Sequence, residues 1–259
     1  MLKRLYIAIL SILAVTGMQA EDLTLRADSA YMADDYTTAL ALYEEAARTE
    51  GTSAELWYNI GNTQYRLGNL GKAILAYERS LRIDPANENT RANLSFVSSK
   101  TIDKTADKGS FLSNAFDSIA TAMSANAWAW TAFICFALML AGVALYIFTM
   151  SISLRKIGFF SAIALAVVTA VSVIIAIRAA GIATSTTEGV VTAKSTILST
   201  SPRTPKDRTE EAMLLHEGTR VSIVDSVSAP SDTTGLKWYD VKIDNAHRAW
   251  IRSTDIEKI

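Results

Sequence analysis

Few side chains in this sequence could carry out catalysis. The 259-residue chain contains two histidines, His216 and His247, and one cysteine, Cys135. Metal sites and nucleophilic centres need such residues at defined spacings, and none of the three has a partner placed by a motif. Ser201 and Ser253 lie in no nucleophile elbow, and the chain has no phosphate-binding glycine loop. The sequence therefore predicts no enzyme, no catalytic residue, no metal site and no cofactor, and it favours a binding function.

The composition limits the kinds of partner that the protein could bind. The net charge of −1 gives no case for nucleic acid as a partner, while half of the residues are apolar. Two runs, 128–150 and 157–177, contain no charged residue. Because a bilayer core needs about 20 apolar helical residues, both runs are long enough to span it. The alternative is a pair of buried helices in a soluble protein, but uncharged runs of this length favour a transmembrane hairpin.

The charges around the hairpin predict its orientation. Arg155 and Lys156 lie in the short connection 151–156, which the positive-inside rule places in the cytoplasm. Residues 1–20 have a basic start, an apolar centre and small residues near the end, as in a secretory signal peptide; an uncleaved anchor is the alternative. Both signals predict a multi-pass protein of the inner (cytoplasmic) membrane with its soluble domains in the periplasm.

The N-terminal part repeats itself after 34 residues. Tyr31 pairs with Tyr65, Ala39 with Ala73, Tyr43 with Tyr77 and Glu44 with Glu78. The second copy reads WYNIGNTQYRLGN and then KAILAYERSLRIDP, which resembles the tetratricopeptide repeat, a pair of antiparallel helices of this period. The resemblance implies an all-α domain over 21–100, with repeats at about 20–53 and 54–87 and a capping helix at 88–99.

That resemblance also implies a binding surface. Stacked repeats of this family form a concave groove lined by the first helix of each pair. By family position the groove residues are Asp28, Tyr31, Met32, Tyr58, Asn62, Tyr65 and Arg66. The mixture suits a peptide segment of a protein partner. It departs from the family's clamp for C-terminal carboxylates, since Tyr58 stands where a lysine is needed. The alternative is that several of these side chains pack against the neighbouring helix.

Two connecting segments flank the membrane runs. Residues 101–127 begin as a polar linker and continue as an amphipathic helix with apolar residues at helical spacing. Those residues are Phe111, Leu112, Phe116, Ile119 and Met123. This helix either lies in the membrane interface or packs on the repeat domain. Residues 178–189 are small and polar and form a short linker.

Residues 190–259 contain seven short β-rich segments separated by turn residues, which favours a closed or nearly closed small barrel. The phrases LLHEGTRVSIVD, KWYDVKIDNAHRAWI and STDIEKI resemble the bacterial SH3 family. The expected core residues are Trp238, Val241, Ile243, Trp250 and Ile251. The fold class is thus a multidomain membrane protein: an all-α tetratricopeptide domain, a two-helix transmembrane hairpin and an all-β SH3-like barrel.

The order of these parts resembles the BatE-type proteins, encoded with the aerotolerance genes of Bacteroides and relatives. The resemblance implies a non-enzymatic scaffold in an envelope complex, with von Willebrand A-domain proteins as partners. A second reading is a cell-wall sensor or tether, because bacterial SH3 domains bind peptidoglycan. A third, an enzyme or transporter component, is disfavoured because the membrane runs offer no ionisable residue for an ion path.

Overall fold

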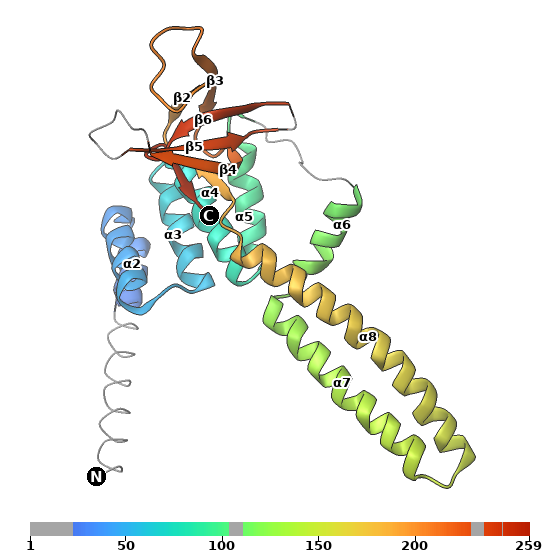
Figure 1. Cartoon of the computed structure of the whole chain (residues 1–259). Helices are drawn as coiled ribbons and strands as arrows, with labels where there is room; N and C mark the ends of the chain where they lie inside the picture. The colour runs from blue at the N-terminus through green and yellow to red at the C-terminus, as the bar shows by residue number, and fades with distance from the viewer. Residues whose placement is uncertain (1–22, 104–110, 229–235, 245) are drawn as a thin grey trace, which may run out of the picture. The chain divides into compact units, whose positions relative to one another are not determined.

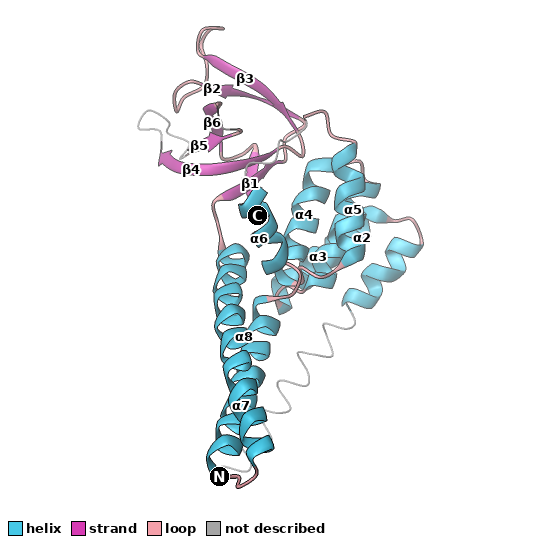
Figure 2. Ribbon diagram, turned by 90° about the vertical axis from the view of Figure 1, so that its right-hand side faces the viewer, coloured by secondary structure: helices cyan, strands magenta, loops and turns pink. Residues whose placement is uncertain are grey.

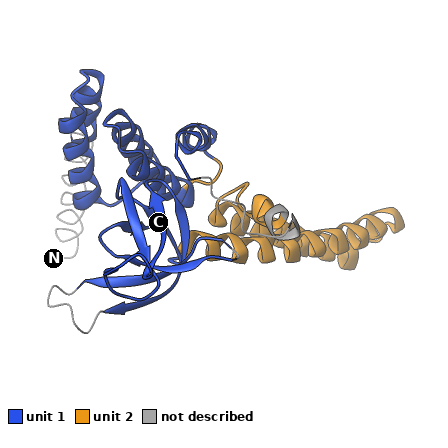
Figure 3. Ribbon diagram, turned by 90° about the horizontal axis from the view of Figure 1, so that it is seen from above, with its two compact units in different colours: residues 1–83, 87–108, 186–259 blue, residues 84–86, 109–185 orange. Residues whose placement is uncertain are grey.

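The computed structural model describes residues 23–103, 111–228, 236–244 and 246–259. The predicted signal peptide, 1–20, lies outside these residues. The chain forms two compact units (Figure 3). The first comprises the N-terminal helices together with residues 186–259, which we call the β-domain. The second contains the long apolar helices, within Gly109–Ser185.

The N-terminal helices follow one another as antiparallel pairs (Figure 1). They are residues 23–32, α2 Tyr36–Glu50, α3 Ala54–Arg66, α4 Leu70–Ile83 and α5 Glu88–Ser99. Asp35, Ser53 and Asn87 cap α2, α3 and α5, because each side chain accepts a hydrogen bond from the backbone N–H three residues on. Asp34 and Gly68 turn the chain within each pair, with φ of 59° and 78°. The predicted helical repeat is therefore confirmed.

Small residues allow the paired helices to pack closely. A Cβ at position 61 would lie 2.6 Å from the ring of Tyr77, so only glycine fits there. Ala39 and Ala73 are 0% exposed, and the larger Tyr43 and Tyr77 fill the remaining space. The repeating pairs Ala39/Ala73 and Tyr43/Tyr77 are thus part of the packed core.

The β-domain is a seven-stranded antiparallel sheet (Figure 2). Its strands are β1 Glu188–Val191, β2 Ser195–Ser199, β3 Glu211–His216, β4 Arg220–Ser228, β5 Lys237–Lys242, β6 Arg248–Arg252 and β7 Ile256–Lys258. Every predicted strand is present. The strand order β3-β2-β6-β5-β4-β1-β7 leaves β3 and β7 as edges, so the sheet is open, whereas the sequence favoured a closed or nearly closed barrel.

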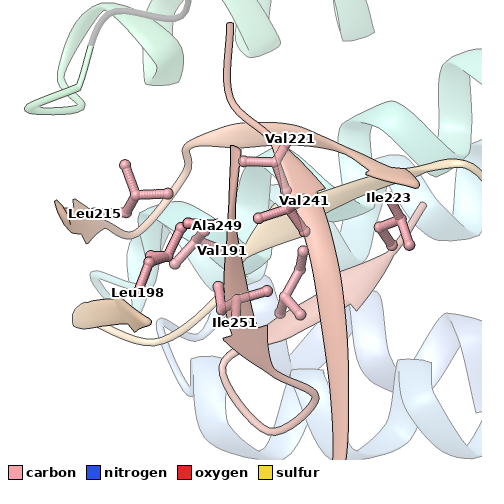
Figure 4. Packing of buried hydrophobic residues seen from close by; sticks show 9 residues of the cluster. Val191, Leu198, Leu215, Val221, Ile223, Val241, Ala249 and Ile251 are labelled. Atoms are coloured by element: carbon pink, nitrogen blue, oxygen red, sulfur yellow. The ribbon is translucent and has the colours of Figure 1, made fainter. Parts of the chain in front are cut away.

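Buried side chains of this sheet form one apolar cluster (Figure 4). Val241 and Ile251 belong to it as predicted, and Ile243 packs against it. Trp250 does not, because β6 alternates and places Ala249 and Ile251 inward. The prediction of Trp250 as a core residue is wrong for this reason.

The β-domain packs against α4, a contact that the sequence did not predict. Val190 lies in the same buried cluster as Ile74 and Tyr77. A Cβ at Gly71 would lie 2.6 Å from the carbonyl oxygen of Val191, so the backbone of α4 touches the backbone of the strand region. The repeat helices and the β-domain therefore share one of their buried clusters.

The second unit contains α6 Phe111–Ala120, α7 Ala125–Phe148 and α8 Ile152–Thr184. Helices α7 and α8 lie side by side and are both long and apolar enough to cross a membrane (Figure 1). In the most apolar stretch of each helix, only 11% of the residues of α7 and 17% of those of α8 are buried. The core helices of a soluble protein are mostly buried instead. Gly142 of α7 faces Gly158 of α8. A Cβ added at Gly158 would lie 2.6 Å from the Gly142 carbonyl oxygen, so the glycines let the two helices approach closely.

The connection between these helices is shorter than expected. The sequence suggested a loop over 151–156, but α8 begins at Ile152 and only Thr149–Ser151 is non-helical. Arg155 and Lys156 are therefore in the first turns of α8, still beside the connection. Nothing in this segment breaks a helix, which explains the extension.

Candidate functional site

A pocket of about 220 Å³ opens between the inner helices of the repeats, and we call it the groove. Its lining residues are Tyr31, Asn62, Tyr65, Arg66, Tyr77, Asn93, Phe96 and Val97. Four of the seven residues predicted from family position, Tyr31, Asn62, Tyr65 and Arg66, thus line one cavity. They come from two successive repeats, and α5 supplies the opposite wall.

Two amide side chains lie at the centre of the groove. The carbonyl oxygen of Asn62 accepts hydrogen bonds from the Tyr77 hydroxyl at 2.7 Å and from Asn93 Nδ2 at 2.9 Å. Asn93 also donates to the Tyr58 hydroxyl at 3.3 Å. The Asn62 carbonyl is therefore engaged by the protein, and this network fixes which way the amides face. Such preorganised amides suit the N–H and C=O groups of a peptide main chain.

Two cations lie over aromatic rings at the edge of the groove. The Arg66 guanidinium is 4.3 Å from the ring centroid of Tyr36 and pairs with Asp34 at 3.1 Å. Lys100 Nζ lies 2.6 Å from the Tyr65 hydroxyl and 4.4 Å from the ring centroid of Phe96. Exposed ion pairs and cation–π contacts are each worth only about 1 kcal/mol or less. Arg66 and Lys100 could therefore exchange these contacts for a carboxylate of a partner.

The other three predicted residues do not line the groove. Asp28 accepts a hydrogen bond from the buried Tyr43 hydroxyl at 2.5 Å and so supports the first helix pair. Met32 is 85% exposed. Tyr58 is half-buried, and its ring lies 6.1 Å from that of Tyr77 in the repeat core. For Asp28 and Tyr58 the alternative of packing against a neighbour is what the structure has.

The groove also contains residues that the sequence analysis did not select. Asn93 and Phe96 come from α5, a segment expected only to close the stack. Lys100, the C-cap of α5, lies at the edge of the groove beside Phe96. The 34-residue period contained the signal, because Asn62 plus 34 is Phe96 and Arg66 plus 34 is Lys100. The groove therefore continues over what the sequence suggested was a cap.

The comparison with known families agrees with this geometry. Residues 24–88 match the tetratricopeptide repeat family. No curated protein matches the chain. The matched stretch covers the helices that carry Tyr31, Asn62, Tyr65 and Arg66, and it ends where α5 begins. Tetratricopeptide domains generally mediate protein–protein interactions, which is the function this stretch suggests.

A second cavity, of about 290 Å³, lies on the opposite face of the repeats, and we call it the outer cleft. Trp57 forms part of it, with the Arg79 guanidinium 4.8 Å from its ring centroid. Arg48 and Lys72 also line it, beside Glu44. The outer cleft supplies a matched alternative against which the groove can be tested.

The two histidines have carboxylate neighbours that the sequence did not reveal. His216 Nδ1 lies 3.1 Å from Asp103 Oδ1, and His247 Nδ1 lies 2.7 Å from Asp244 Oδ2. Asp103 also accepts hydrogen bonds from the His216 backbone N–H and from Thr219 Oγ1, both at 2.7 Å. These contacts fasten the segment after α5 to the β-domain. Within the described ranges, no group of three His, Cys, Asp or Glu side chains could hold a metal ion.

Proposed function

We propose that this protein is a membrane-anchored scaffold, without catalytic activity, whose groove binds an extended peptide segment of a protein partner. The observation that carries the proposal is the single cavity in which Tyr31, Asn62, Tyr65 and Arg66 meet Asn93 and Phe96. Aromatic rings and arginine are the residue types most enriched at binding hot spots. A cavity of about 220 Å³ accepts one or two side chains of a chain passing along the groove, not a folded domain.

The anchor consists of α7 and α8, inserted as a hairpin. Arg155 and Lys156, beside the connection, support a cytoplasmic position for it under the positive-inside rule. The repeats and the β-domain then share the periplasmic side of the inner membrane. Alkaline phosphatase fused after Lys104 or after Arg178 should be active, and a fusion at Ser153 inactive. Activity from the Ser153 fusion alone would reverse the orientation.

The order of the domains along the chain also suggests the complex in which the protein acts. Like BatE-type proteins, this chain combines repeats, two apolar helices and a β-domain, which we propose to be SH3-like. Its partners would then be envelope proteins of an aerotolerance-related complex, among them proteins with von Willebrand A domains. This assignment supplies a candidate to look for in binding experiments.

A second candidate function is attachment to the cell wall through the β-domain. A cavity of about 340 Å³ in the β-domain supports it, lined by the apolar Ile197, Leu214 and Pro205 with Trp238 and Arg252. Aromatic and aliphatic side chains of this kind can hold a muropeptide. Muropeptides immobilised on a resin should retain the detergent-solubilised full chain if this function is correct. Retention that is unchanged by Trp238→Phe and Leu214→Asp would place any such binding elsewhere.

A pair of matched double variants tests the groove. Arg66→Glu with Lys100→Glu reverses both groove cations, and Arg48→Glu with Lys72→Glu makes the same charge change at the outer cleft. Recovery of partners crosslinked in native membranes should fall at least tenfold for the groove variant and little for the outer variant. Both should retain the helical circular dichroism of the parent. Loss of recovery with the outer variant alone would place binding at the outer cleft.

A further inference from the structure

Helix α6 has an exposed apolar side that no described residue of its unit covers. Phe116 is 39% exposed and Ile119 is 50% exposed; Met123, in the turn that follows the helix, is 36% exposed. Phe116 and Ile119 are three residues apart and so lie on the same side of the helix. A short helix normally buries its apolar side, so this exposure requires an occupant.

The adjoining side of α6, which carries Ala120 and Asp117, is fastened to the apolar hairpin. Ala120 is 0% exposed and lies in a cluster with Ile175 and Ala179 of α8. Trp128 of α7 packs on the same cluster and donates from Nε1 to the Ala120 carbonyl oxygen at 3.3 Å. Helix α6 is therefore held by contacts with both long helices.

A charged pair completes this attachment. Arg178 Nε and Nη2 donate to the two carboxylate oxygens of Asp117 at 2.8 Å and 3.0 Å. A bidentate arginine–carboxylate pair fixes orientation as well as distance.

The position of Arg178 along α8 shows the level at which α6 lies. The uncharged run 157–177 is about 30 Å long at about 1.5 Å per residue, which matches a hydrocarbon core. Arg178 is the next residue, so it stands where the hydrocarbon ends. Asp117 is paired with it, which brings α6 to the same boundary.

We propose that α6 binds the lipid surface, lying in the headgroup layer with Phe116, Ile119 and Met123 inserted among the acyl chains. This inference rests on the proposed membrane insertion of α7 and α8. The occupant is the bilayer because the apolar side of α6 continues the exposed apolar surface of the hairpin to which α6 is fastened. The described part of α6 carries Asp117 as its one charge and no lysine or arginine, so the insertion of apolar side chains provides the binding, independently of anionic lipid.

Spin labels on the full chain test this proposal. In a Cys135→Ser background, single cysteines replace Phe116, Ile119, Ser118 and Leu138, and each protein is reconstituted into phosphatidylcholine vesicles. Ser118 is the matched control, exposed and roughly 200° around the helix from Phe116. Leu138, 53% exposed on α7, reports whether the hairpin is in lipid.

Apolar oxygen and a water-soluble nickel complex then compete for each label. The ratio of oxygen to nickel accessibility should be at least fivefold higher at 116 and 119 than at 118, and highest at 138. The ratios should stay within twofold when a quarter of the lipid is replaced by phosphatidylglycerol. A high ratio at 138 with equal ratios at 116, 118 and 119 overturns the inference and leaves the membrane anchor standing. Protection of 116 and 119 from both reagents means that a protein covers α6, which also overturns it. A low ratio at 138 shows that the hairpin is not inserted, and the anchor and the inference fail together.

Discussion

Helices α3 and α4 form one helix pair, yet their free faces have opposite roles. The face of α3 opens on the groove, where Arg66 is half exposed and Tyr65 is within reach of solvent. The face of α4 is covered by the β-domain, whose Glu217 accepts a hydrogen bond from the Gly71 N–H at 3.1 Å. One face is available to a partner, and the other already has one within the chain.

The charges on the two faces show the same difference. On α4, Glu78 pairs with Arg220 at 2.6 Å, and Arg79 and Arg82 donate to the carbonyl oxygens of Lys258 and Ile259. Burial raises the pKa of Glu78, and Arg220 offsets part of that effect. Charges used in this way stabilise the fold. We therefore expect substitutions of the α4 residues that contact the β-domain to change stability, and substitutions at the groove to change binding.

The largest effect should come from the core shared by both faces. Tyr77→Ala removes a ring that is 1% exposed and should lower the free energy of unfolding by about 3–5 kcal/mol. Gly61→Leu should be comparably severe, because a Cβ there already meets that ring. Urea unfolding of the detergent-solubilised chain measures both. An unchanged unfolding midpoint for either variant would show that the helices do not pack as described.

A smaller effect should follow from separating α4 from the β-domain. Gly71→Leu places a side chain against the Val191 carbonyl oxygen and should cost about 1–3 kcal/mol. Hydrogen exchange should quicken in β1 and β7 while α3 stays protected. Uniform quickening across the repeats and the β-domain would mean that the two faces are not separable.

Asp103 should give this contact a dependence on pH. Burial alone would raise the pKa of Asp103, but hydrogen bonds from Thr219 and from the His216 backbone outweigh it and lower the pKa overall. A lowered folded-state pKa stabilises the fold above the unfolded value near 3.9, and that stability is lost as pH falls through the folded value. Asp103→Asn should therefore cost about 1 kcal/mol at pH 7.

The difference between Asp103→Asn and the parent chain should shrink below about pH 4. Unfolding at pH 7, 5, 4 and 3 in the same detergent measures it. Other carboxylates with a lowered pKa, such as Asp244, are present in both proteins, so their effects on stability cancel from the comparison. A difference that stays constant over this range would exclude Asp103 as the titrating group.

The smallest effect should be at the turn beside the groove. Asp34 has φ of 59°, which favours glycine, but its carboxylate also pairs with Arg66. Because the pair is exposed, Asp34→Gly should change stability by less than about 1 kcal/mol. It should also free Arg66, so partner recovery should be equal or higher. A large loss of stability would show that the groove edge is structural after all.

Local patterns predicted most of the elements. The helix over Glu88–Ser99 and all seven strands follow from periodicity and turn residues, which act over short stretches of chain. Neighbouring residues of a strand point to opposite faces, so an inward Ile251 already implies that Trp250 in β6 lies outside the core. The contact between α4 and the β-domain could not be predicted in this way, because Gly71 and Glu217 are 146 residues apart and exposed charges are usually solvated.

The groove was predicted in part for a similar reason. Family position selects the side of each first helix and found Asn62, Tyr65 and Arg66. It does not show which neighbour a side chain meets, so Tyr58 and Asp28 were selected although both pack against other residues of the repeats. Lys100 was missed because the segment after the second repeat was expected to be a cap.

Site-specific crosslinking in native membranes tests the central claim most directly. A photoreactive benzoylphenylalanine is placed at Tyr65 in the groove or at Ala47 in the outer cleft. Irradiation should join a protein to position 65 and not to position 47, and mass spectrometry can check for a von Willebrand A domain. Arg66→Glu with Lys100→Glu should abolish the product. A product from position 47 alone, or one from position 65 that survives both charge reversals, would contradict binding in the groove.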